Sequence, residues 1–191
     1  MSLRFAPFTV RGSAGVVLVA AGALLGACSD SSGTDDGGPP ASMEVVGGNG
    51  QQGVVGEELV GPLVVKVTDD RGRPVRGQLV NWRVTAGGGS VFAGSALTNR
   101  EGVAQERWTL GTVAGAAQRV EARAVDDVTG AALVFATFEA TAEAGPATTL
   151  APSVEGPLAA PVGAAIPTPI TARATDRFDN PVPGVVVTWT A

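Results

Sequence analysis

Residues 63–84 read LVVKVTDDRGRPVRGQLVNWRV, and this stretch decides the fold. Every second residue of 63–68 is apolar, and apolar residues alternate with polar ones again along 80–84. Alternation of this kind is typical of β-strands with one buried face. Between the two runs, residues 69–74 are Asp, Arg, Gly and Pro, which favour turns. The stretch therefore predicts two β-strands joined by a turn-rich connection.

The same pattern recurs further along the chain. Residues 55–84 align without gaps with residues 162–191, at a constant offset of 162 − 55 = 107. The identical pairs include Thr68/Thr175, Asp69/Asp176, Pro74/Pro181 and Trp82/Trp189. A period near 100 residues is the length of one immunoglobulin-like sandwich. We therefore predict an all-β chain with one complete immunoglobulin-like β-sandwich, residues 43–142, and the N-terminal strands of a second, residues 146–191. Without an opposing sheet, the second copy is expected to be locally unstable.

The alternation also predicts the core of the first sandwich. The residues expected there lie on the apolar phase of their strands: Val65, Val67, Val80, Trp82, Trp108, Val120 and Phe138. An alternative for the two tryptophans is a sugar-stacking platform, but their apolar phase favours core packing. Glu106 breaks the pattern, because it falls on the same phase as Trp108. We interpret it as the mark of a bulge or of a strand end.

The N-terminus has the features of an export signal. Arg4 and Arg11 precede the uncharged run VVLVAAGALL at 16–25, and small residues follow it. These features define a signal peptide, residues 1–27, and the run is too short to cross a bilayer. The polar segment 28–42, rich in Ser, Gly, Asp and Pro, is expected to be a flexible linker.

The end of this signal resembles the lipobox of bacterial lipoproteins, on the residues Leu25, Gly26, Ala27 and Cys28. The resemblance implies that the Cys28 thiol carries a covalent lipid and becomes the first residue of the mature protein. The alternatives are an ordinary secretory signal with an accidental cysteine and a short buried helix. Ser29, rather than Asp, follows the cysteine, which favours the outer membrane or the cell surface over the inner membrane.

Composition excludes several function classes. The net charge is −5, and without residues 1–27 it becomes 11 − 18 = −7. An acidic surface argues against nucleic acid as a partner. The chain has no His and a single Cys, so an internal disulfide, a Cys/His zinc site and a catalytic His are all excluded. We predict no catalytic residue, no metal site and no cofactor other than the lipid on Cys28. The paired aspartates are interpreted as turn residues, with a weak calcium site near Asp126 or Glu143 left open.

Four stretches together resemble the group 1 bacterial immunoglobulin-like domains (Big-1). They are VKVTDDRGRPVRGQLVNWRV at 65–84, GGGSVF at 87–92, TNREGVAQERWTLGTVAG at 98–115 and QRVEARAV at 118–125. Such domains are the repeated modules of invasin- and intimin-type surface proteins. The resemblance covers the first copy from end to end, whereas the second copy is covered only through the Trp189 strand.

These observations predict a non-enzymatic, lipid-anchored protein of the bacterial cell envelope with tandem immunoglobulin-like modules. The expected activity is adhesion or surface binding, with an unknown surface protein or glycan as ligand and the membrane as a partner through the lipid. The alternative is a structural spacer that displays a distal domain, catalytic or not, beyond residue 191.

Overall fold

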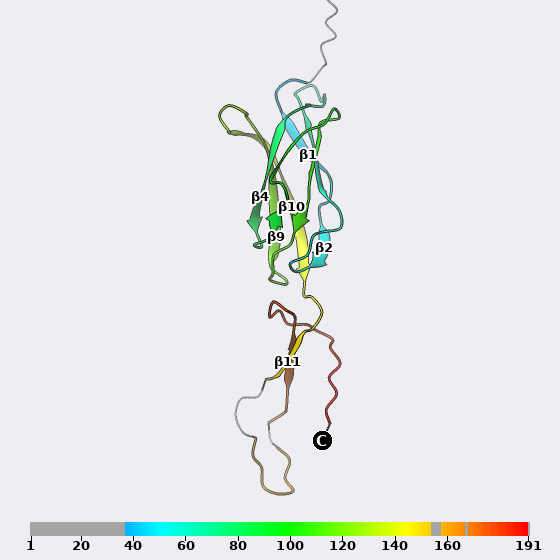
Figure 1. Ribbon diagram of the computed structural model, residues 1–191, viewed down its shortest axis with the longest axis vertical. Helices are drawn as coiled ribbons and strands as arrows, with labels where there is room; N and C mark the ends of the chain where they lie inside the picture. Colours follow the sequence, from blue (N-terminus) through cyan, green and yellow to red (C-terminus); the bar gives the residue numbers. More distant parts are fainter. Residues whose placement is uncertain (1–36, 154–157, 167, 191) are drawn as a thin grey trace, which may run out of the picture. The chain divides into compact units, whose positions relative to one another are not determined.

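The computed structural model describes residues 37–153, 158–166 and 168–190. Within these ranges the regular structure consists of strands (Figure 1). The described residues contain no helix long and apolar enough to cross a membrane. The expected signal peptide and the lipobox residues Leu25, Gly26, Ala27 and Cys28 lie outside the described residues.

The smaller sheet of the first copy has the strand order β1-β3-β7. Its strands are β1 (Ser42–Gly47), β3 (Leu63–Thr68) and β7 (Val103–Glu106). Both neighbouring pairs are antiparallel, and β1 carries an irregularity between Val45 and Gly47. Along β3 the residues alternate between buried and half-buried, as the sequence pattern predicts. This sheet therefore turns one apolar face inward.

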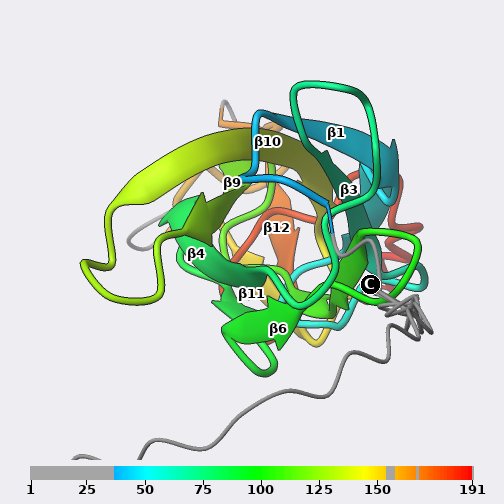
Figure 2. The ribbon, with the colours of Figure 1, turned by 90° about the horizontal axis from the view of Figure 1, so that it is seen from above.

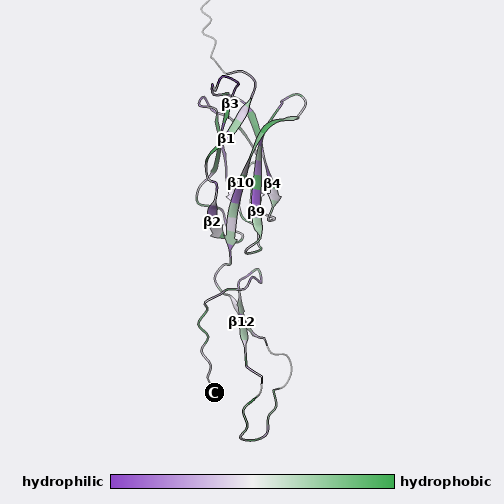
Figure 3. Ribbon diagram, turned by 180° about the vertical axis from the view of Figure 1, so that it is seen from behind, coloured by the Kyte–Doolittle hydropathy of each residue, from purple (hydrophilic) through white to green (hydrophobic). Residues whose placement is uncertain are grey.

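The larger sheet has the strand order β2-β10-β9-β4-β6. Its strands are β2 (Gln51–Val54), β10 (Ala132–Glu143), β9 (Ala117–Val125), β4 (Leu79–Ala86) and β6 (Ser95–Leu97). Strand β2 runs parallel to β10, and the other neighbours are antiparallel. Buried residues alternate with more exposed ones along most of β9 and along the second half of β10. Hydrophilic and hydrophobic bands follow each other in this part of the sheet (Figure 3), so this sheet also has one inward face.

The two sheets face each other and form an immunoglobulin-like sandwich. Seen from above, β1 and β3 lie on one side, and β10, β9, β4 and β6 curve around the other (Figure 2). Strands β1, β3 and β7 take the places of immunoglobulin strands A, B and E, and β4, β9 and β10 those of C, F and G. Two short strands, β5 (Ser90–Val91) and β8 (Trp108–Thr109), pair separately. The predicted fold class is confirmed.

The core lies between the two sheets. All seven residues expected there are buried: Val65, Val67, Val80, Trp82, Trp108, Val120 and Phe138. Antibody domains join strands B and F by a disulfide under the tryptophan of strand C. Here Trp82 lies on the C-type strand β4, and its neighbours on the B- and F-type strands are aliphatic. Apolar packing therefore replaces the disulfide.

The sandwich begins earlier than the sequence indicates. Residues 38–42 were expected in the linker, but the Gly38 N–H donates to Asp69 Oδ2 at 2.9 Å and the Ala41 N–H donates to the Thr68 carbonyl at 2.9 Å. Polar composition hides these contacts, because they are made by the main chain. At the other end, β10 continues to Glu143.

The second copy is only partly strand-forming. Strand β11 (Thr149–Pro152) pairs antiparallel with β12 (Ala172–Thr175). The sequence predicts a further strand around Trp189, but residues 182–190 form none. The reason is that the equivalent strand β4 lies between β9 and β6, and the described residues of the second copy contain no counterpart of either.

Candidate functional site

The aspartates of the described residues act in turns. Asp126 Oδ1 accepts hydrogen bonds from the N–H of Thr129 at 2.7 Å, from its hydroxyl at 2.8 Å and from the Val128 N–H at 3.1 Å. The Thr129 backbone bond, followed by its hydroxyl bond, lowers the pKa of Asp126. The described part of the chain brings together no group of three or more acidic residues that could hold a metal ion. These contacts support the turn interpretation.

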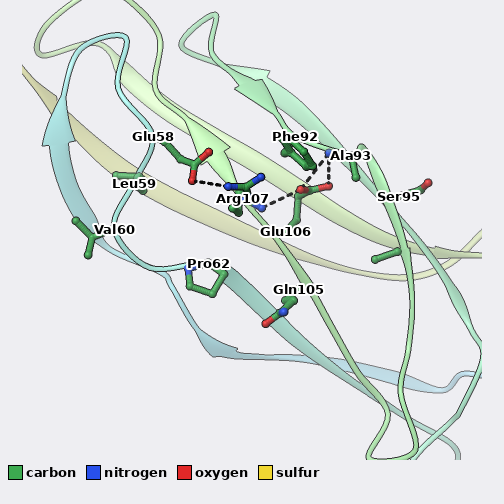
Figure 4. Close-up of a pocket in the computed structure, with 11 residues that line it drawn as sticks. Glu58, Leu59, Val60, Pro62, Phe92, Ala93, Ser95, Gln105, Glu106 and Arg107 are labelled. Atoms are coloured by element: carbon green, nitrogen blue, oxygen red, sulfur yellow. Dashed lines mark hydrogen bonds and ion pairs between the residues drawn. The ribbon is translucent and has the colours of Figure 1, made fainter.

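A groove of about 350 Å³ opens where the edges of the two sheets meet (Figure 4). Its walls come from the edge strands β6 and β7 and from the loops that follow β2 and β5. The lining residues are Glu58, Leu59, Val60, Pro62, Phe92, Ala93, Ser95, Ala96, Gln105, Glu106 and Arg107. The groove is a more promising binding site than the sheet faces, because concave surfaces bury more of a ligand.

Glu106 holds the floor of this groove. Glu106 is only 4% exposed. The carboxylate accepts hydrogen bonds from the N–H groups of Gly94 at 2.8 Å, Arg107 at 2.8 Å and Ala93 at 3.1 Å. A buried carboxylate with several such donors is stable and fixes the loop that supplies them. The predicted strand end is present, because β7 ends at Glu106.

Phe92 and Arg107 form the rim. Phe92 is 73% exposed, and the Arg107 guanidinium lies 4.1 Å from the centre of its ring. Arg107 Nη1 also lies 3.3 Å from Glu58 Oε1, as Figure 4 shows. Aromatic residues, Phe among them, and arginine are both enriched at protein interfaces. The neighbouring Val60 is fully exposed as well.

The arrangement favours binding over chemistry. The one buried carboxylate of the groove already accepts three backbone N–H groups, and its arginine is paired with Glu58. Sequence reasoning missed the rim residues, although a signal existed: Phe92 is a large aromatic side chain directly after the turn-like GGGSV. None of the seven predicted core residues lines the groove.

No protein-family model matches the chain, and no curated protein matches its sequence. The chain is similar to the solved structure of FdeC, described as a novel, broadly conserved Escherichia coli adhesin that elicits protection against urinary tract infections. The TM-score is 0.42 and the identity 17%, over 75% of this chain and 42% of that one. The chain thus spans less than half the length of that structure. The resemblance to group 1 bacterial immunoglobulin-like domains stays a prediction.

Proposed function

We propose that this chain is a non-enzymatic adhesin-type protein of the bacterial cell envelope, built from group 1 bacterial immunoglobulin-like modules. One observation carries the proposal: the exposed Phe92 adjoins a loop that the buried Glu106 holds in place, and its ring lies against Arg107. A binding site needs such a rigid base, because a pre-ordered surface loses less conformational entropy when a ligand binds.

The chemistry of the groove favours a protein ligand. Its exposed apolar residues, Val60 and Phe92, would gain from burial against another apolar surface. The ion pair of Glu58 and Arg107 would contribute hydrogen bonds at the edge of that contact. A glycan is the second candidate in the same groove, because a sugar ring can stack on Phe92.

The experiment compares two exposed phenylalanines. The full chain is titrated against arrays of immobilised extracellular surface proteins and of glycans, as wild type, Phe92→Ala and Phe135→Ala. Phe135 is 64% exposed on β10 and lies outside the groove, so it is the matched control. We expect the Phe92→Ala variant to bind at least about tenfold more weakly, as for a hot-spot residue. A ligand whose affinity is the same for all three proteins would contradict a role for the groove.

We also propose that a lipid on Cys28 attaches the protein to the outer membrane or the cell surface, with no other cofactor. Two or more acyl chains anchor a protein stably, whereas a single one binds only marginally. Intact mass of the protein recovered from membranes should show the acyl chains on Cys28. A Cys28→Ala variant that still partitions with membranes at the same acylated mass would contradict this part of the proposal.

The alternative function is that of a spacer. The hydrogen bonds that Asn180 of the second copy makes to Thr112 and Ala114 of the first favour it, because they fix two successive modules to each other. A spacer would show the same ligand binding in the Phe92→Ala variant and would carry its activity in residues beyond 191.

A further inference from the structure

The turn at 69–74 in the first copy is organised around one carboxylate. Asp69 Oδ1 accepts the N–H groups of Arg71 and Arg73, both at 2.9 Å. Its Oδ2 accepts the Gly38 N–H at 2.9 Å, so the turn also holds the entry of the chain into the sandwich. The Arg73 side chain folds back, and its Nη2 lies 2.7 Å from Asp69 Oδ2.

The turn at 176–181 in the second copy repeats this geometry at the offset of 107 residues. Asp176 Oδ1 accepts the N–H groups of Phe178 at 2.8 Å and of Asn180 at 3.0 Å. Asp176 Oδ2 accepts the Gly145 N–H at 2.9 Å. The two turns therefore have the same backbone scaffold, although only the first residue, Asp, and the last, Pro, are identical. Phe178 and Asn180 stand where the first copy has Arg71 and Arg73.

The side chain of Asn180 bonds to both copies at once. Its Nδ2 donates to Asp176 Oδ2 at 3.0 Å and to the Thr112 carbonyl of the first copy at 2.8 Å. Its Oδ1 accepts the Ala114 N–H of the first copy at 2.9 Å. Asn180 is only 7% exposed. A buried amide that satisfies a donor and an acceptor of the neighbouring copy specifies how that neighbour is placed.

Phe178 fills the space beside Asn180. Its ring packs against the core cluster of the first copy. A Cβ placed on Gly56 would lie 2.8 Å from Phe178 Cζ, closer than two carbon atoms approach. The backbone of Gly56 also has a φ of +71°, which side chains rarely adopt. In the first copy, Gly56 thus leaves room for the Phe178 ring, and the Thr112 carbonyl and the Ala114 N–H pair with the Asn180 amide.

We propose that Phe178 and Asn180 form a joint that fixes the second copy on the end of the first, and that arginine at these two positions cannot form it. The end of the first copy that carries Gly56, Thr112 and Ala114 thus binds the turn of a following module. The first copy carries Arg71 and Arg73 at the equivalent positions. Its own turn therefore lacks the side chains needed to dock on a preceding module in this way.

The chemistry of arginine explains the difference. A guanidinium has donors but no acceptor. An arginine at position 180 would therefore leave the Ala114 N–H, which donates to Asn180 Oδ1 in the wild type, without an acceptor. An unpaired buried donor and a buried cation both destabilise an interface. Arginine still fits the turn itself, as the contact between Arg73 and Asp69 demonstrates. Substitution by arginine should therefore prevent docking of the second copy and leave its turn intact.

The test is amide hydrogen exchange by NMR on the full chain. We compare the wild type with the double variant F178R/N180R, which places the two arginines of the first turn at the equivalent positions of the second. The Ala114 N–H should exchange roughly fivefold faster in the variant, the factor expected for one net hydrogen bond. The Gly145 N–H reports the turn of the second copy and should keep its protection. Equal Ala114 rates in the two proteins would overturn the proposal.

A second variant leaves the turn sequence intact. Gly56→Ala removes the space for the Phe178 ring, and Gly77→Ala is its control, because Gly77 has the same φ of +71° and no atom near its missing Cβ. Faster exchange of Ala114 in Gly56→Ala alone supports the joint, even where F178R/N180R unfolds the turn. Equal exchange in both glycine variants contradicts it.

Discussion

The ring of Trp82 lies 5.7 Å from the ring of Phe138, centre to centre, with the two planes inclined by 42°. The two side chains come from β4 and β10, which are separated by β9 in the larger sheet. Tilted aromatic pairs at this distance attract each other beyond the burial of their surfaces. The contact joins the middle of this sheet across its inner face.

The Trp82→Ala variant should lose about 3–5 kcal/mol of unfolding free energy, because it leaves a cavity in the core. The repeat supplies the control: Trp82 is 4% exposed, whereas the equivalent Trp189 is 59% exposed. Trp189→Ala should therefore stay within about 0.5 kcal/mol of the wild type. Urea unfolding followed by circular dichroism measures both. Equal losses in the two variants would refute the assignment of Trp82 to the core.

Glu106→Ala should destabilise the sandwich by about 1–3 kcal/mol in total, because it removes the acceptor of several part-buried N–H groups. Three N–H groups depend on this carboxylate, those of Ala93, Gly94 and Arg107. Glu106→Gln keeps one acceptor oxygen and should lose less. Chemical unfolding gives the order wild type, Gln, Ala. The exposed neighbour Gln105 provides the control, and a Gln105→Ala variant as unstable as Glu106→Ala would contradict the role of Glu106.

Acid should weaken the fold through Asp69. The backbone N–H of Gly38, followed by those of Arg73 and Arg71 and the Arg73 side chain, holds the pKa of Asp69 well below its usual range despite burial. Because the folded pKa is the lower one, the ionised group stabilises the fold above about pH 4, its unfolded pKa. This contribution is lost as the pH falls through the folded pKa. Asp69→Asn should therefore cost less stability in strong acid than at neutral pH, as urea unfolding at each pH would show. An equal cost at both pH values would contradict this linkage.

The pKa of Asp176 should depend on Asn180. Burial raises the pKa of Asp176, but hydrogen bonds from the Asn180 side chain and from the N–H groups of Gly145, Asn180 and Phe178 together bring it down to about 2. Asn180→Ala removes the side-chain bonds, so the pKa of Asp176 should rise. Carboxyl carbon shifts in an NMR titration measure it, with Asp126 as the group that should not move. An unchanged Asp176 titration would mean that the amide contact is absent in solution.

Much of the sandwich follows from the sequence, because its information is local. Alternation along 63–68 and 80–84 identifies the strands and the buried side chains, including Val65 and Trp82. The acidic turn residues are also predictable, since Asp and its backbone partners are neighbours in the chain.

The groove and the joint depend on distant contacts. Glu106 is visible as an exception to the pattern, but the loop that it binds lies 12 to 13 residues upstream, and nothing in the sequence links them. For the joint a signal does exist: in a turn whose Asp and Pro the repeat keeps, Phe178 and Asn180 stand where the first copy has Arg71 and Arg73. Its meaning requires the other half of the contact, the backbone near Ala114, which has no side-chain signature.

The outermost strands have a further consequence. At the rims of the two sheets, β2 has four residues, β6 has three, β7 has four, and β1 is interrupted at Val45. Long, straight outer strands offer a template on which another molecule's main chain can extend the sheet into a fibril. Short or kinked outer strands do not provide such a template. The edges of this sandwich therefore give neighbouring copies little main chain on which to polymerise.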